Sequence, residues 1–224
     1  MPDAPRLAIF DCDGTLVDSQ ANICRAMDEA FVTAGLPPPP GAATRRIVGL
    51  SLVEAMRALR PEASDAEHRA LANGYKDAYQ RLRATGSLDG EPLFDGVLGT
   101  LGRLHDAGWL LGVATGKSDR GLAHVLAAHG IADLFATLQT ADRHPSKPDP
   151  AMLHAALAAC GVQPHMTAMI GDTSFDMAMA RAAGCRAVGV AWGYHSRAEL
   201  ADAGAEVIAE HATDLLPMLG RLLA

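Results

Sequence analysis

The feature that most restricts the fold is a regular alternation of short apolar segments with helical patterns from residue 94 to the end of the chain. Such alternation is typical of βαβ units built around a parallel sheet. The expected strands are residues 7–10, 109–114, 136–139, 168–171, 187–191 and 206–209. The expected helices of this part are residues 97–107, 119–129, 150–160, 175–183, 197–203 and 213–223.

Residues 18–88 interrupt this alternation, because they contain helical patterns but no convincing strand. The expected helices here are residues 20–34, 51–59 and 66–84, with four prolines between the first two. An insertion of this length is too long for an ordinary crossover between two strands. We therefore expect a Rossmann-like α/β parallel-sheet core, residues 1–17 and 89–224, and an inserted all-helical cap domain, residues 18–88.

Composition excludes several classes of protein. The chain of 224 residues is 49% hydrophobic, which is enough for a sizeable core. Its net charge is −7 without a stripe of lysine or arginine, which argues against a nucleic-acid partner. No apolar run reaches membrane-spanning length, and the four cysteines contain no CxxC pair. We expect a cytoplasmic protein without a membrane partner, in which an anionic substrate needs local positive charge.

Two acids, Asp11 and Asp13, directly follow the first expected strand, which is a buried apolar run. A buried unpaired charge is costly, so the fold has no structural use for them there. The carboxyl ends of parallel strands are where ligands bind in open α/β sheets. These acids are therefore expected to hold a cation, to act as a nucleophile, or to do both.

Polar side chains follow other expected strands in the same way. Thr115 and Gly116 follow the second strand, Lys147 lies between two prolines before a helix, and Asp172 and Asp176 follow the strand at 168–171. Each has an ordinary alternative role as a turn residue, a helix cap or a solvated charge. Their common placement at one edge of the sheet favours a site.

Four segments together resemble the motifs of the haloacid dehalogenase-like (HAD) hydrolase superfamily, and the helical insert resembles its helical-cap subgroup. The resemblance covers nearly the whole chain. The segments are Asp11-Cys12-Asp13-Gly14-Thr15, Ala114-Thr115-Gly116-Lys117, Ser146-Lys147-Pro148 and Gly171-Asp172-Thr173-Ser174-Phe175-Asp176.

The resemblance implies a role for each catalytic position. Asp11 would be the nucleophile that forms an aspartyl-phosphate intermediate, and Asp13 would act first as the acid and then as the base. Thr115 would donate a hydrogen bond to the phosphoryl group, and Lys147 would neutralise its charge. Gly116 would belong to the substrate-binding residues.

The resemblance also implies Mg²⁺ as the cofactor. Its ligands would be Asp11, the carbonyl of Asp13 and Asp172, with Asp176 in the coordination shell or just outside it. Mg²⁺ prefers oxygen ligands, and it would screen the repulsion between a carboxylate nucleophile and a phosphate dianion. The positive charge that an anionic substrate needs would thus come from the site itself, although the chain as a whole is acidic.

Asp13 bears on the choice between branches of the superfamily. Dehalogenases of the superfamily lack an acid there, because halide needs no proton to leave, so the resemblance implies cleavage of a small phosphorylated metabolite. A phosphosugar mutase is disfavoured because Leu52, rather than arginine, follows Gly49-Leu50-Ser51. A pyrophosphatase remains an alternative. A phospho-aspartate receiver module, also α/β, is the alternative outside enzymes.

Two further segments, residues 44–51 and 192–195, resemble phosphoglycolate phosphatases and favour a phosphoglycolate-like phosphomonoester. Arg45 or Arg46 in the first segment could bind a substrate carboxylate through two hydrogen bonds. The alternative, that both are exposed charges of a cap helix, is equally open at this point.

Overall fold

The structure is a computed structural model, and it describes residues 5–224. Six parallel strands form one sheet in the order β3-β2-β1-β4-β5-β6, which confirms the predicted fold class. Every expected strand is present within one or two residues of its expected ends. The strands are β1 (Leu7–Phe10), β2 (Leu110–Thr115), β3 (Thr137–Thr140), β4 (Thr167–Gly171), β5 (Arg186–Val190) and β6 (Val207–Ala209).

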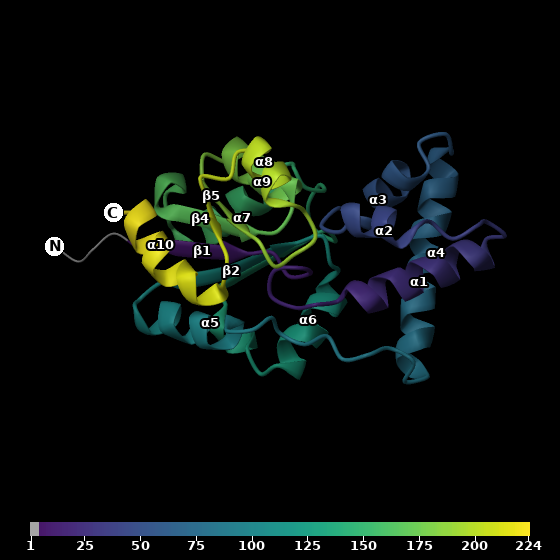
Figure 1. Ribbon diagram of the computed structural model, residues 1–224, viewed down its shortest axis with the longest axis horizontal. Helices are drawn as coiled ribbons and strands as arrows, with labels where there is room; N and C mark the ends of the chain where they lie inside the picture. The colour runs from purple at the N-terminus through teal and green to yellow at the C-terminus, as the bar shows by residue number, and fades with distance from the viewer. Residues whose placement is uncertain (1–4) are drawn as a thin grey trace.

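Helices cover both faces of the sheet, so the core has three layers (Figure 1). One face packs against α5 (Val97–Asp106), α6 (Asp119–Ala128) and α10 (Leu215–Leu222). The other packs against α7 (Ala151–Cys160), α8 (Ser174–Ala182) and α9 (Arg197–Asp202). Three short 3₁₀ helices, η1 (Ala132–Leu134), η2 (Pro164–Met166) and η3 (Ala212–Asp214), lie in the connections.

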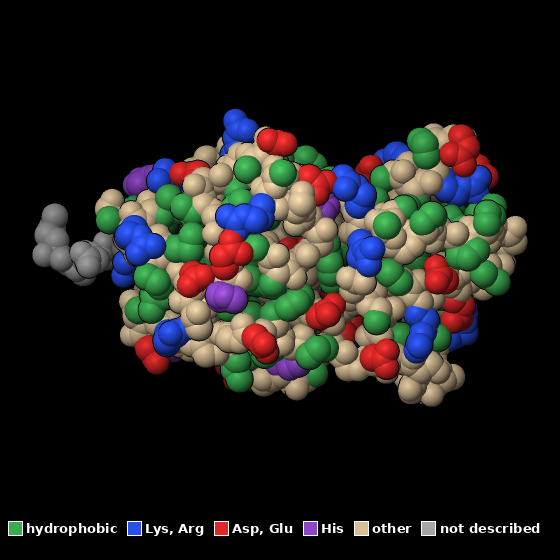
Figure 2. Space-filling view, in the orientation of Figure 1, with side chains coloured by type: hydrophobic (Ala, Val, Ile, Leu, Met, Phe, Trp, Pro, Cys, Tyr) green, Lys and Arg blue, Asp and Glu red, His purple; other side chains and the backbone are tan. Residues whose placement is uncertain are grey.

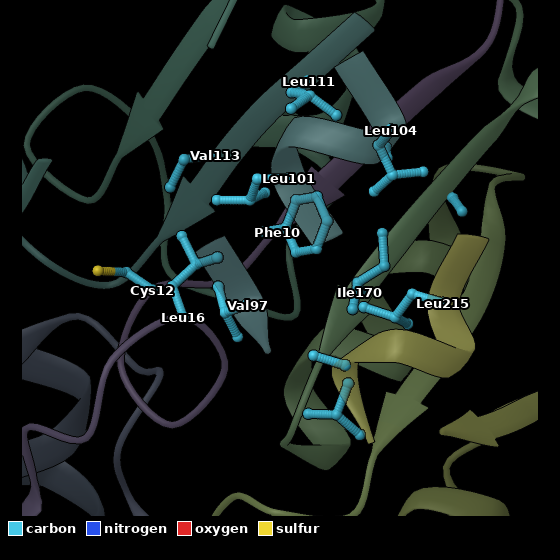
Figure 3. Packing of buried hydrophobic residues seen from close by; sticks show 14 of the residues in the cluster. Phe10, Cys12, Leu16, Val97, Leu101, Leu104, Leu111, Val113, Ile170 and Leu215 are labelled. Carbon is cyan, nitrogen blue, oxygen red and sulfur yellow. The ribbon is translucent and has the colours of Figure 1, made fainter. Parts of the chain in front are cut away.

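Alternation of side chains along β1 explains why the sheet is buried on both faces. Ala8 and Phe10 point into the cluster beneath α5 and α10, where Phe10 meets Leu101 and Leu104 (Figure 3). Ile9 belongs to the cluster on the opposite face. A central strand that is apolar on both sides has to end where the first charged residue appears, and that residue is Asp11.

The inserted helices pack beside the sheet as a separate unit, which we call the cap (Figure 1). Its own small cluster includes Met27, Phe31, Met56 and Leu71. In the space-filling view the surface is hollowed where the cap meets the core (Figure 2). The cap consists of α1 (Gln20–Thr33), α2 (Gly41–Arg46), α3 (Leu52–Leu59) and α4 (Asp65–Ala84).

Helix α2 is the one cap element that the sequence analysis missed. It begins directly after four consecutive prolines, a composition that indicates a linker, and it has only six residues. Helix α4 by contrast begins at a complete capping box, in which Ser64 and Glu67 satisfy each other's backbone N–H groups. None of the helices in residues 5–224 combines the length and the apolar character needed to cross a membrane.

The two chain segments that join the cap to the core are bonded to each other. The N–H of Asp18 donates to the carbonyl of Pro92 at 2.9 Å, and the N–H of Phe94 donates to the carbonyl of Leu16 at 3.0 Å. An isolated bridge pairs Val17 with Leu93 in antiparallel fashion. The cap is therefore attached through a short two-stranded junction next to the strand that carries Asp11.

Candidate active site

The sheet order brings the motif residues together. β1 lies between β2 and β4, so Asp11, Thr115 and Asp172 lie at the carboxyl ends of three adjacent strands. Lys147 reaches the same edge from the loop between β3 and α7, and Asp176 from the first turn of α8.

Asp11 is completely buried, and its two carboxylate oxygens have different surroundings. Oδ1 accepts a hydrogen bond from the N–H of Cys12 at 2.7 Å and lies 2.9 Å from Nζ of Lys147. Oδ2 is buried and has no hydrogen-bond partner within residues 5–224. Burial raises the pKa of Asp11 to about 7; the charge of Lys147 opposes this rise, and that of Asp176 adds to it.

Lys147 is the only lysine of the buried set, with 1% of its surface exposed. Its Nζ lies 2.6 Å from Oδ1 of Asp176 as well as beside Asp11. Burial alone would lower the pKa of Lys147, but the charges of Asp11 and Asp176 together raise it above the ordinary value. Lys147 is therefore a permanent cation that holds two carboxylates.

Asp172 is held by core groups on both of its oxygens. Oδ1 accepts from the hydroxyl of Thr15 at 2.8 Å, and Oδ2 accepts from the N–H of Tyr194 at 2.9 Å. Burial, followed by the charges of Asp11 and Asp176, raises the pKa of Asp172 well above its ordinary value. Gly14 belongs to this packing, because a Cβ there would lie 2.2 Å from Oδ2 of Asp172. Only glycine allows such an approach, and its φ of +87° also favours glycine.

Asp176 caps a helix with one carboxylate oxygen and contacts Lys147 with the other, and its part in metal binding stays a prediction. Its Oδ2 accepts from the N–H and the hydroxyl of Thr173, at 3.1 and 2.7 Å, which completes the capping box of α8. Its Oδ1 faces Lys147. The helix cap fixes the side chain, and the free side of the carboxylate points into the site.

The three buried acids Asp11, Asp172 and Asp176 fit a divalent cation that prefers oxygen. One carboxylate oxygen from each lies within 4.8 Å of the others. Three buried carboxylates face a single lysine, and Asp11 Oδ2 is an oxygen without a partner. A hard cation would supply the missing positive charge and take the free oxygen as a ligand.

Asp13 points away from these acids. Its Oδ1 accepts from the hydroxyl of Ser19 at 2.5 Å and from Nζ of Lys117 at 2.7 Å. The side chain is outside the group whose oxygens could share a cation. This placement agrees with the expectation that Asp13 binds metal through its carbonyl and keeps its carboxyl for proton transfer, a role that stays a prediction.

Thr115 and Gly116 end β2 at the junction with the cap. Thr115 is buried, and its Oγ1 accepts from the N–H of Lys117 at 3.1 Å. A Cβ at Gly116 would lie 2.6 Å from the carbonyl oxygens of Gly49 and Leu50 in the cap. The absence of a side chain at Gly116 thus lets the cap come into contact with the motif.

The loop between α2 and α3 lies directly over the acids. Gly49 has a φ of +97°, and a Cβ there would be 3.8 Å from Oδ2 of Asp11. The next residues of this loop are bound to the core, since the N–H of Ser51 donates to the hydroxyl of Ser146 at 2.8 Å. In this conformation the cap covers Asp11.

Replacing Gly116 with alanine should therefore push the cap away from the core. We expect kcat/KM to fall by about 10²-fold, the scale of a displacement of about 1 Å at a reacting centre. Steady-state kinetics would measure the loss, and circular dichroism would verify the fold. Gly99→Ala in α5 is the matched control, because nothing lies within 4 Å of its added Cβ. Equal activity of the two variants would contradict the prediction.

Arg45 and Arg46 lie at the end of α2, and both are exposed. Arg46 forms a salt bridge of 2.5 Å with Glu199 of α9, at the rim between cap and core. Neither arginine lines the cavity described next. Their proposed contact with a substrate carboxylate would require the cap to rearrange.

A cavity of about 310 Å³ lies between the cap and the loop after β2. It starts at Asp13 and runs beneath α4, where Tyr75 and Tyr79 belong to its lining. Asp11, Thr115, Lys147 and Asp172 do not line it. Of the two acids Asp11 and Asp13, only Asp13 therefore borders the cavity.

Two charged residues of the site were not assigned roles from sequence. Lys117 is bound to Asp13 and lies 3.7 Å from Oε2 of Glu91. Glu91 also accepts hydrogen bonds from Tyr79 and Asn22, so it connects two cap helices to the cap junction. The signal for Lys117 was its place directly after Thr115-Gly116, whereas Glu91 follows a glycine-containing segment that gave no signal.

Comparisons with known proteins agree with this geometry. Residues 8–190 match the family model described as haloacid dehalogenase-like hydrolase. The chain is 34% identical over 222 residues to a phosphoglycolate phosphatase from Yersinia pseudotuberculosis, covering 97% of this chain and 94% of that protein. It is 33% identical over 222 residues to a phosphoglycolate phosphatase from Vibrio cholerae, covering 96% of each.

A solved structure leads to the same family. The crystal structure of a hydrolase from Pseudomonas syringae superposes with a TM-score of 0.83 at 27% identity, covering 96% of this chain and 98% of that one. With the family model matched over most of its length and its four motifs assembled at one sheet edge, the chain belongs to the haloacid dehalogenase-like hydrolases.

Proposed function

We propose that the protein hydrolyses a small phosphomonoester through an aspartyl-phosphate on Asp11 with Mg²⁺ as cofactor, and that phosphoglycolate-like substrates are favoured. The chain is a phosphoric monoester hydrolase. The observation that carries the finer proposal is the division of the two acids. Asp11 is buried beside Lys147 with one oxygen unpaired, and Asp13 faces a separate cavity.

In the first step Asp11 attacks phosphorus, and the bond from phosphorus to the leaving oxygen breaks. Asp13 transfers its proton to that oxygen, so the alcohol leaves neutral. Lys147 offsets the charge of the phosphoryl group, and the Thr115 hydroxyl donates a hydrogen bond to it. Asp11, Asp172, Asp176 and the Asp13 carbonyl would hold Mg²⁺, which when bound screens the repulsion between Asp11 and the phosphate dianion.

In the second step a water molecule attacks phosphorus, and the bond to Asp11 breaks. Asp13, now a carboxylate, takes a proton from the attacking water. The products are inorganic phosphate and the regenerated Asp11 carboxylate. Splitting hydrolysis into two displacements is the advantage of a covalent carboxylate nucleophile.

Metal removal tests the proposal. With an aryl phosphate or 2-phosphoglycolate we expect phosphate release in the presence of Mg²⁺, and a loss on the order of 10³-fold after EDTA treatment, since a metal supplies several kcal/mol to such a transition state. Readdition of Mg²⁺ should restore the rate. Turnover that persists unchanged in EDTA would exclude the metal-dependent mechanism.

Trapping the intermediate tests the covalent step, and the products and the lifetime of the intermediate separate this proposal from its alternatives. Borohydride added during turnover should reduce an acyl phosphate at Asp11 to homoserine, which mass spectrometry identifies. A phosphosugar mutase would isomerise a phosphosugar without net phosphate release, and a pyrophosphatase would prefer pyrophosphate. A receiver module would keep phosphate on Asp11 for many minutes. Any of these outcomes would replace the proposed function.

A further inference from the structure

The cavity beside Asp13 has the position of a leaving-group site. Under the proposed function, Asp13 gives its proton to the leaving oxygen, so the leaving group has to lie on the side of Asp13. The cavity is lined by Asp13 but not by Asp11, Thr115 or Lys147. Its occupant is therefore the part of the substrate that departs.

Most of the side chains that the cap contributes to the walls of this cavity are apolar. Ile23 and Met27 of α1, Leu52 and Ala55 of α3 and Tyr75 of α4 line it. Ligand cavities of about 300–1,000 Å³ enclose molecules much larger than a two-carbon acid. With about 310 Å³ available while the cap touches Gly116, the cavity suits a leaving group with an apolar body longer than two carbons.

The charged groups of the cavity are not balanced. Of its two acids, Asp13 is paired with Lys117, and Asp142, whose Oδ2 accepts from the N–H of Asp119 at 2.9 Å, keeps its charge. Lys76, Arg83 and Arg120 also line the cavity, and none of them forms a salt bridge with a carboxylate within residues 5–224. Lys76 and Arg120 are exposed, where unpaired cations are ordinary, whereas Arg83 is half-buried and its unpaired charge calls for a partner.

Arg83 is held against an aromatic ring of the cavity wall. Its guanidinium carbon lies 5.1 Å from the centre of the Tyr79 ring, and the Tyr79 hydroxyl is in turn bound to Glu91. Stacking on a fixed ring holds the planar guanidinium and leaves its N–H groups available. A carboxylate is the group that this fork binds best through two hydrogen bonds.

We propose that the enzyme's substrate is a phosphomonoester whose leaving group has an apolar body of more than two carbons and ends in a carboxylate that Arg83 binds. This inference rests on the proposed function and narrows its substrate class, from phosphoglycolate-like phosphomonoesters in general to those whose carboxylate lies farther from the phosphate than in 2-phosphoglycolate. Lys76 and Arg120 add positive charge at the rim, which attracts such a dianionic or trianionic substrate to an acidic protein.

A matched set of phosphates tests the proposal. ω-Carboxyalkyl phosphates with two, four and six carbons are compared with alkyl phosphates of the same lengths, by kcat/KM with Mg²⁺. The two-carbon acid of this series is 2-phosphoglycolate. We expect the acids with four and six carbons to exceed their alkyl partners by about 10- to 100-fold, the scale of a charged hydrogen-bonded pair. The two-carbon acid should gain less, because it fills the least of the apolar part of the cavity.

Arg83→Gln should abolish this preference, so that kcat/KM for the four- and six-carbon acids falls to the level of their alkyl partners. Arg69→Gln on the same helix is the control, because Arg69 is exposed and does not line the cavity. Circular dichroism establishes that both variants fold.

The outcomes separate this proposal from the proposed function. Equal kcat/KM for acids and alkyl phosphates, with Asp11-dependent turnover intact, would overturn the proposal and leave the function standing. An Arg83→Gln variant whose kcat/KM falls equally for the acids and the alkyl phosphates would also overturn the proposal, because an equal loss indicates a structural role for Arg83. Absence of turnover for every phosphomonoester would remove the proposed function itself.

Discussion

Replacing Asp11 with asparagine is expected to lower kcat by roughly 10⁴- to 10⁶-fold, the range found when a covalent nucleophile is removed. The amide cannot form the acyl phosphate, and it also removes the unpaired oxygen that fits a cation. The same substitution should make the metal-free protein more stable. Function and stability are therefore in conflict at this position.

The direction of the stability effect follows from the pKa of Asp11. Burial raises it from 3.8 to about 7, so the folded protein binds a proton more tightly than the unfolded chain does. Stability of the metal-free protein therefore falls as pH rises from about 4 to about 7. Asparagine carries no charge to bury, so its advantage should be full at pH 8 and small near pH 4.

Urea unfolding in EDTA measures this effect. We expect Asp11→Asn to be more stable than wild type by about 2 kcal/mol at pH 8, the scale of an incompletely compensated buried group, and by less at pH 5. Mg²⁺ should stabilise wild type strongly and the variant weakly. Asp133→Asn is the control, because this acid is exposed in η1. A variant that is less stable than wild type at pH 8 in EDTA would contradict the account.

The layered core was predictable because its signals are local and repeat along the chain. Each strand is a short apolar run, and several helices end at a glycine with positive φ, such as Gly161 after α7. The strand order was not predicted, since it depends on how distant segments pair. Helix α2 was missed because four prolines precede it. A proline restricts the backbone of the residue before it, so Pro40 does not prevent a helix that begins at the next residue.

The site was predictable to the extent that its residues follow strand ends. Sequence analysis named the buried acids and Lys147, and a parallel sheet then brings those positions to one edge. It could not find the pairing of Lys117 with Asp13, or the stacking of Arg83 on Tyr79. The first contact depends on the conformations of two core loops, and the second on the side-chain rotamers of two residues four apart in α4. Arg46 illustrates a further limit, because its salt bridge with Glu199 depends on how the cap sits on the core.

Lys147 is the counterpart of Asp11, and replacing it with methionine should have the opposite effect on stability. The apolar chain is of similar length but leaves Asp11, Asp172 and Asp176 buried without a cation. Removing one partner of a buried ion pair costs about 3–5 kcal/mol, which we expect at pH 8 in EDTA. Lowering the pH or adding Mg²⁺ should restore part of this loss, because protons or the metal then offset the carboxylates.

Activity should also fall by on the order of 10³-fold in Lys147→Met even with saturating Mg²⁺, since a positioned cation at the phosphoryl group is lost. The double variant Lys147→Met/Asp11→Asn identifies the cause of the instability. If the cost comes from uncompensated charge, Asp11→Asn should stabilise the Lys147→Met protein by more than it stabilises wild type, whereas loss of packing would make the effects of the two substitutions add. Additive effects, or a Lys147→Met protein as stable as wild type in EDTA, would mean that Lys147 does not balance the buried acids.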